Sequence, residues 1–225
     1  FLPAGAMKHF GVTDPRLEDY MEGLLPSREG VLTDMEAHAE REGLGIIGPL
    51  QGHFLYTLVL ALKPKDILEV GTAIGYSAMW LSMAAEKVEG RVVTIERDNS
   101  RAVWAEAYMR QAELSGVCAV RRGEALVLMR GMEESFDLVF LDVLTQFDRP
   151  DTALDLLDLC VRRLRPGGVL LSDNALRSGQ VLAPQDHSPS TQGIAAFNQA
   201  IFTHPRLTST IIPLRDGLSM SVKGF

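Results

Sequence analysis

The chain has 225 residues, of which 46% are hydrophobic and 23% charged, and its formal net charge is −7 at pH 7. This length suits one α/β domain with a sizeable core and is too short for two comfortable domains. The acidic balance argues against a strong general affinity for nucleic acid or acidic membranes, although it is compatible with a local basic groove. No stretch approaches the ~20 apolar residues of a membrane span, and residues 1–7 lack the basic region of a signal peptide, so we expect a cytoplasmic protein.

The spacing of apolar residues predicts three helices before the first strand. The pair Asp14-Pro15 is a good helix start, because Asp caps free N–H groups and Pro fits the first helical position. We expect these helices at about 15–25, 31–42 and 50–62.

From residue 66 onward the predicted strands and helices alternate. Strands are expected at 66–70, 91–96, 117–121, 136–142 and 168–172, with helices at 76–87, 99–114 and 150–164. Such alternation is typical of a parallel sheet with helices on both faces.

The end of the chain has a different pattern. A helix at 191–203 precedes two strands at 208–213 and 218–222, and the short turn at Asp216-Gly217 predicts an antiparallel hairpin. Residues 177–190 are the least regular segment and the best candidate for a substrate loop, with a plain surface loop almost as well supported.

The turn after the first strand is the first candidate for ligand binding, because ligands of a doubly wound sheet lie beyond the carboxyl ends of its strands. Gly71 and Gly75 allow a sharp backbone turn and a close approach of a ligand. Their G-x-x-x-G spacing differs from the three-glycine dinucleotide pattern. Glu69, two residues earlier, can pair with an ammonium group, whereas a pyrophosphate would be repelled there.

The ends of the next two strands complete a cofactor site. Glu96, followed by Arg97, suits the hydroxyls of a ribose. Gly123, Glu124 and Ala125 follow the third strand, where adenine would lie. One acid for an amino group and another for a ribose fit S-adenosylmethionine better than NAD.

The fourth and fifth strands end in oxygen-bearing side chains. Asp142 ends the fourth strand, and Asp173-Asn174 follow the fifth. If these strands are neighbours, two carboxylates and one amide oxygen converge, which suits a hard ion such as Mg²⁺, with Mn²⁺ or Ca²⁺ as alternatives. A bound dication would acidify a coordinated hydroxyl and orient it toward the methyl sulfonium, so Asp142 is also a catalytic candidate.

Five segments together resemble the metal-dependent catechol and caffeoyl-coenzyme-A type O-methyltransferases, especially their small bacterial members. They are ILEVGTAIGYSA (67–78), RVVTIERD (91–98), FDLVFLD (136–142), LRPGGVLLSDNAL (164–176) and LTSTIIPLRDGLSMSVK (207–223). The resemblance runs from about residue 30 to the end and is specific for the family rather than for the acceptor.

This resemblance implies the class I methyltransferase fold, a Rossmann-like doubly wound α/β sheet of seven strands with an antiparallel last strand and N-terminal helices. We therefore expect a single domain over 1–225, with a helical cap at 1–63 and a Rossmann-like core at 64–225. Many members are homodimers, so we also expect a homodimer.

The resemblance also implies roles for individual residues. The metal ligands would be Asp142, Asp173 and Asn174. The S-adenosylmethionine site would be lined by Glu69, Gly71, Thr72, Tyr76, Ser77, Glu96 and Asp142, with Ala125 near adenine. Ile47 and Gly48 match a short loop that closes over the cofactor in relatives.

One position departs from the family pattern. Relatives usually carry a lysine three residues after the Asp of the fourth strand, as general base for the acceptor hydroxyl, and Thr145 stands there in this chain. Threonine cannot act as a base near neutral pH, whereas a phenol could be ionised by a metal without help. His187 is a weaker candidate for the missing base, and Arg177 is a candidate to meet an anionic acceptor.

Three interpretations of function remain at this point. The first is methylation of a catechol-like small molecule. The second is methylation of 5-hydroxyuridine at the tRNA wobble position, because GTAIGYSA followed by TIERD is similar to bacterial members that do so; the acidic balance weakens it. The third is an S-adenosylmethionine-binding protein with weak or no catalysis, supported by Thr145 alone.

Overall fold

A computed structural model describes residues 14–28, 30–147 and 149–225. In this part of the chain a seven-stranded sheet has the order β3-β2-β1-β4-β5-β7-β6. The strands are β1 (Asp66–Val70), β2 (Arg91–Glu96), β3 (Cys118–Arg122), β4 (Phe136–Leu141), β5 (Leu164–Ser172), β6 (Leu207–Ile212) and β7 (Leu218–Lys223). β1 to β5 pair in parallel, and β7 is antiparallel to both β5 and β6. The predicted sheet, including its antiparallel last strand, is confirmed.

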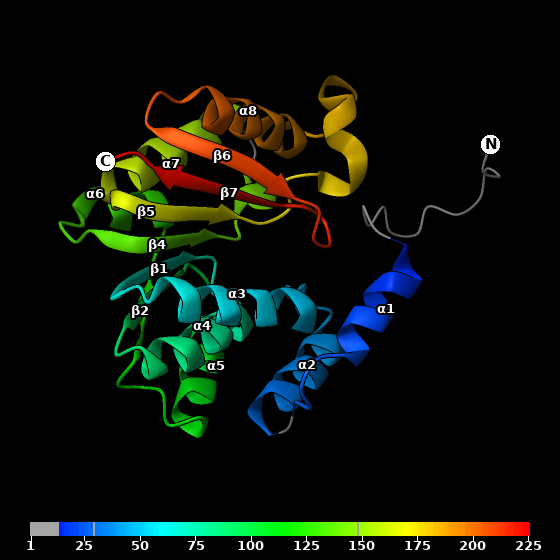
Figure 1. The fold of residues 1–225 in the computed structure, drawn as a ribbon, viewed down its shortest axis with the longest axis vertical. Helices are drawn as coiled ribbons and strands as arrows, with labels where there is room; N and C mark the ends of the chain where they lie inside the picture. The colour runs from blue at the N-terminus through cyan, green and yellow to red at the C-terminus, as the bar shows by residue number, and fades with distance from the viewer. Residues whose placement is uncertain (1–13, 29, 148) are drawn as a thin grey trace.

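Helices cover both faces of this sheet (Figure 1). They are α1 (Pro15–Gly23), α2 (Val31–Glu42), α3 (Gly48–Leu62), α4 (Tyr76–Lys87), α5 (Asn99–Gln111), α6 (Ala125–Gly131), α7 (Pro150–Arg163) and α8 (Pro189–Thr203), with 3-10 turns η1 (Leu144–Gln146), η2 (Arg177–Leu182) and η3 (Pro184–Asp186). Successive strand residues serve opposite faces, as the alternation of strand side chains requires. Ile67 and Leu138 pack with α2 to α5, whereas Leu68 and Val139 pack with α6 to α8.

The N-terminal helices differ in how closely they join the core. α2 and α3 bury Met35 and Leu55 in the same apolar cluster as the sheet residue Phe140. α1 contributes no buried residue and extends away from the sheet (Figure 1). No described helix is long and apolar enough to cross a membrane. The sequence prediction for residues 1–7 lies outside the described residues.

The structure departs from the predicted elements in a few places. The sequence pattern predicts no helix between the third and fourth strands, but α6 is present there. Its seven residues make only two turns, which is too short for a clear apolar period. The segment predicted to be irregular, 177–190, contains η2, η3 and the first residues of α8.

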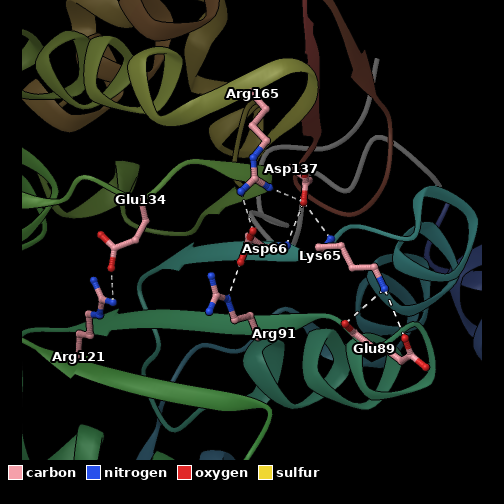
Figure 2. A network of polar contacts seen from close by, with 8 residues as sticks. All are labelled: Lys65, Asp66, Glu89, Arg91, Arg121, Glu134, Asp137 and Arg165. Atoms are coloured by element: carbon pink, nitrogen blue, oxygen red, sulfur yellow. Dashed lines mark hydrogen bonds and ion pairs between the residues drawn. The ribbon is translucent and has the colours of Figure 1, made fainter.

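Ion pairs join the amino ends of four strands (Figure 2). Arg165 binds Asp66 at 2.7 Å and Asp137 at 2.8 Å, and Arg91 donates to the other oxygen of Asp66. Asp137 also accepts the backbone N–H groups of Lys65 and Asp66, at 2.8 and 2.9 Å. This network ties together the amino ends of these strands. The carboxyl ends, on the opposite side of the sheet, take no part in it.

Candidate active site

The strand register brings four predicted site residues side by side. Val70 pairs with Ile95 and with Leu141, and Leu141 pairs with Ser172. The next residue of each strand therefore follows in one row, in the order Glu96, Gly71, Asp142 and Asp173. This row lies where the strand order reverses between β1 and β4, which is the usual ligand position in a doubly wound sheet.

Two adjoining cavities open along this row. The smaller, about 40 Å³, is lined by Val70, Gly71, Ile95, Glu96, Arg97, Gly123, Glu124, Ala125, Val143, Gln146 and Phe147. The larger, about 320 Å³, is lined by Gly45, Ile46, Gly71, Ala73, Glu96, Arg101, Asp142, Thr145, Gln146, Asp173, Asn174 and Arg177. The first holds the residues predicted to lie near adenine, and the second holds the predicted metal ligands. Glu96 and Gly71 border both, so one elongated ligand could extend from one cavity into the other.

Glu96 is oriented by the backbone around it. Its Oε2 accepts the N–H of Ala73 at 2.7 Å, and its Oε1 accepts the N–H of Asp98 at 2.8 Å. A carboxylate has further lone pairs beyond these two bonds. The remaining acceptor capacity fits the two hydroxyls of a ribose.

Gly71 is the tightest point of the row. Its φ of +101° lies in the region that favours glycine, and an added Cβ would stand 2.6 Å from the carbonyl oxygen of Asp142. The close approach of this turn to the end of β4 therefore requires glycine.

Six predicted cofactor residues line neither of these two cavities: Ile47, Glu69, Thr72, Gly75, Tyr76 and Ser77. Tyr76 instead donates its hydroxyl to Glu36 Oε1 at 2.6 Å, and Thr72 contacts Thr94. Their predicted contacts with the cofactor stay predictions.

Glu69 lies beneath the turn rather than in its opening. The side chain is fully buried, its Oε2 accepts the hydroxyl of Thr94 at 2.5 Å, and its Oε1 has no hydrogen-bond partner. Burial raises the pKa of Glu69 to about 7, although the hydroxyls of Ser77 and Thr94 act in the opposite direction. The predicted pairing of Glu69 with an ammonium group therefore stays a prediction.

Asp142 and Asp173 form a pair of acids at the larger cavity. Burial and the negative charge of Asp173 raise the pKa of Asp142 well above its ordinary value. Burial likewise raises the pKa of Asp173, with the side chain of Gln51 acting against it, and Asp173 Oδ1 is buried without a hydrogen-bond partner. Such a pair is costly without a positive partner.

A divalent cation fits this pair chemically. Among the described residues no cluster of three or more His, Cys, Asp or Glu side chains is placed to hold a metal, so the predicted site depends on a third ligand of another type, the amide oxygen of Asn174. Asn174 Nδ2 donates to Asp216 at 3.4 Å, which leaves its Oδ1 available. Two carboxylates, one of them with an unpartnered oxygen, and an amide oxygen are ligands that Mg²⁺ accepts.

Arg215 is a site residue that the sequence patterns do not single out. It lies in the turn between β6 and β7, and its guanidinium donates to the carbonyl of Ile47 at 2.5 Å. Its charge lowers the pKa of both Asp142 and Asp173, against the larger effect of burial. Its Nη1 also occupies the space of a side chain at Gly48, where an added Cβ would stand only 1.6 Å away. In the sequence, Arg215 stands next to Asp216-Gly217, and this pattern indicates a turn but gives no sign of a role at the site.

The remaining residues considered for the site differ in whether they line the larger cavity. Thr145 is half-buried in the wall of the larger cavity, as is Arg177. His187 is exposed and lines neither cavity, which argues against it as the missing base. His53 packs with Tyr56 and Trp80, with ring centroids 6.1 and 6.0 Å away.

Comparison with known proteins identifies the chain that carries this site. A family model described as O-methyltransferase matches residues 31–224. The chain belongs to the O-methyltransferase family. A catechol O-methyltransferase of Niastella koreensis is 30% identical over 217 residues, covering 92% of this chain and 96% of the relative. The predicted resemblance to the catechol and caffeoyl-coenzyme-A type enzymes is thereby confirmed.

Solved structures of other O-methyltransferases agree with this assignment. The Bacillus cereus O-methyltransferase in complex with SAH is 29% identical, has a TM-score of 0.82, and matches over 92% of this chain and 97% of its own. TomG from Streptomyces achromogenes, involved in tomaymycin synthesis and solved with SAM, is 26% identical with a TM-score of 0.82, over 93% of this chain and 96% of its own. This O-methyltransferase is thus an S-adenosylmethionine-dependent enzyme of the class I fold.

Proposed function

We propose that this enzyme transfers the methyl group of S-adenosylmethionine to a hydroxyl of a catechol-like small molecule held by a divalent cation. The observation that carries this proposal is the acid pair. Asp142 and Asp173 are adjacent across neighbouring strands, and Asp173 keeps a buried oxygen without a donor. With Asn174 they would hold Mg²⁺ first of all, or Mn²⁺ or Ca²⁺, beside the cavity that also reaches Glu96.

The proposed methyl transfer assigns a role to each part of the site. Glu96 binds the ribose, and the cavity around Ala125 receives the adenine, which together hold the methyl sulfonium near the acid pair. A bound dication would lower the pKa of a coordinated hydroxyl and hold it in place. The acceptor oxygen then forms a bond to the methyl carbon, the carbon–sulfur bond breaks, and its electron pair stays on sulfur. Because Thr145 cannot take the hydroxyl proton near neutral pH, that proton leaves to solvent.

Transfer of labelled methyl from S-adenosylmethionine to 3,4-dihydroxybenzoate tests this proposal. We expect turnover with Mg²⁺, loss of turnover with EDTA, and loss in the Asp173→Asn variant although its fold is kept. Undiminished turnover in EDTA would contradict the metal site. Cofactor binding without turnover would contradict the catechol assignment, and unmodified tRNA would then be the next acceptor to assay.

Two further properties are proposed, the first from the family resemblance and the second from the sequence pattern. We expect a homodimer, which light scattering of the purified protein measures directly. We also expect a cytoplasmic location, which fractionation of the source cells would test.

A further inference from the structure

Arg177 lies at the acceptor end of the larger cavity. It follows Asn174 by three residues, and its N–H donates to the carbonyl of Asn174 at 3.2 Å. Its φ of +46° is in the left-handed region, which a residue with a side chain adopts only where its surroundings hold it. The next N–H, of Ser178, is held by Asp216 at 2.5 Å. The backbone therefore keeps Arg177 at the cavity wall next to a predicted metal ligand.

Arg177 has no charged partner among the residues that the structure describes. Across the described ranges, no ion pair or side-chain hydrogen bond involves Arg177, and its Nε is buried without a partner. The positive charge that lowers the pKa of both Asp142 and Asp173 comes from Arg215. The other arginine of the cavity, Arg101, acts on Asp98 at the start of α5.

An arginine in this state fits an anionic ligand. A guanidinium at a cavity wall without a described counter-charge can pair with a carboxylate in the cavity through two parallel hydrogen bonds. We propose that the acceptor is an aromatic acid, with its hydroxyl groups at the acid pair and an ionised carboxylate paired with Arg177. This inference rests on the proposed function and narrows its substrate class.

A matched pair of acceptors tests the inference. 3,4-Dihydroxybenzoate and 3,4-dihydroxybenzyl alcohol share the catechol group and differ in the charge of the side group. In Arg177→Met we expect kcat/KM for the acid to fall roughly 10- to 100-fold, mainly through KM, with the alcohol changed by about twofold at most. Arg177→Lys should restore part of the activity on the acid. Arg110→Met, an exposed arginine of α5, serves as the control and should change neither acceptor.

Equilibrium binding separates this inference from the proposed function. We expect SAH-loaded wild-type protein to bind the acid more tightly than the alcohol in calorimetry, and Arg177→Met to lose that preference. Binding of this kind without turnover would overturn the proposed function and uphold the role of Arg177. Equal losses for both acceptors in Arg177→Met, or no preference of the wild type for the acid, would overturn the inference.

Discussion

Thr145 lines the larger cavity together with Asp142, at the position where the family resemblance leads us to expect a lysine base. A hydroxyl side chain cannot remove a proton at neutral pH, so methyl transfer has to wait for an acceptor that is already ionised. The wild-type rate should therefore rise with pH until the acceptor hydroxyl is ionised.

Restoring a base at this position tests that argument. We expect Thr145→Lys to raise kcat/KM at pH 7 by at least about tenfold, because a positioned general base contributes typically 10²–10⁴-fold. The pH–rate profile should also flatten above neutrality. Thr145→Ser, which adds no base, is the control. A Thr145→Lys enzyme no faster than wild type would show that proton removal does not limit this reaction.

Glu69 makes the stability of the protein depend on pH. Its pKa is about 7 in the folded chain because of burial, against an ordinary value near 4.5. The folded state therefore binds more protons than the unfolded state between these values. The stabilisation is fully present below pH 4.5 and is lost as the pH rises through about 7.

Glu69→Gln removes this dependence while keeping an acceptor for Thr94. The fall in unfolding free energy between pH 4.5 and pH 8, measured by urea denaturation in EDTA, should shrink by roughly 3 kcal/mol relative to wild type. Asp142 and Asp173 shift in the same direction, so wild type and variant are compared at each pH. An unchanged pH dependence would mean that Glu69 titrates near its ordinary value.

At the scale of elements, the carboxyl ends and the amino ends of the parallel strands have different roles. The carboxyl ends of β1, β2, β4 and β5 present the site, and the amino ends are tied together by Asp137 and Arg165 (Figure 2). Although burial raises the pKa of Asp137, Arg165 and two backbone N–H groups outweigh it and hold that pKa below its ordinary value. Because this network lies opposite to the site, we expect it to affect stability and not cofactor binding.

Asp137→Ala should therefore destabilise the fold without weakening cofactor binding. We expect a loss of about 1–3 kcal/mol in urea denaturation, since two backbone N–H groups lose their acceptor. The affinity for S-adenosylmethionine, measured by calorimetry, should stay unchanged. Asp155→Ala is the matched control, because its pair with Arg130 is exposed on both sides and should contribute little. A weakened cofactor affinity in Asp137→Ala would contradict this division of tasks.

At the scale of the whole molecule, the N-terminal helices α2 and α3 share one core with the sheet. Met35 and Leu55 lie in the same cluster as Ile67 and Phe140. A part of the chain that shares its core with the rest cannot unfold without exposing both. We therefore propose that α2 and α3 form one cooperative unit with the core that begins at residue 64.

Two probes of unfolding test this proposal. Trp80 on α4 packs against Gly52 on α3, and Trp104 on α5 packs edge-on against His38 on α2, so tryptophan fluorescence reports on both contacts between these helices and the core. Far-ultraviolet circular dichroism reports on all helices. We expect coincident single transitions in urea. A fluorescence change that precedes the loss of helix signal would show that the N-terminal helices unfold separately.

The parallel sheet, built from alternating strands and helices, is the part of this protein that the amino-acid sequence determines most directly. Glu96, Gly71, Asp142 and Asp173 were all predicted as site residues from their places after strands, because the carboxyl ends of parallel strands must meet at one edge. The family motifs that contain these residues are short contiguous segments, and they predict the same site residues. The sequence pattern does not predict α6, because a helix of two turns is too short to show a recognisable apolar periodicity.

Contacts between distant elements required the tertiary structure. Only the tertiary structure shows that Arg215 reaches Ile47 and that its charge lowers the pKa of both acids. The same holds for the full burial of Glu69 and for the unpartnered Nε of Arg177. Periodicity and capping report on neighbours a few residues apart in the chain. The direction and burial of a side chain depend on elements far away in the chain, 25 residues for Glu69 and Thr94 and 168 residues for Arg215 and Ile47, and no local pattern in the sequence encodes them.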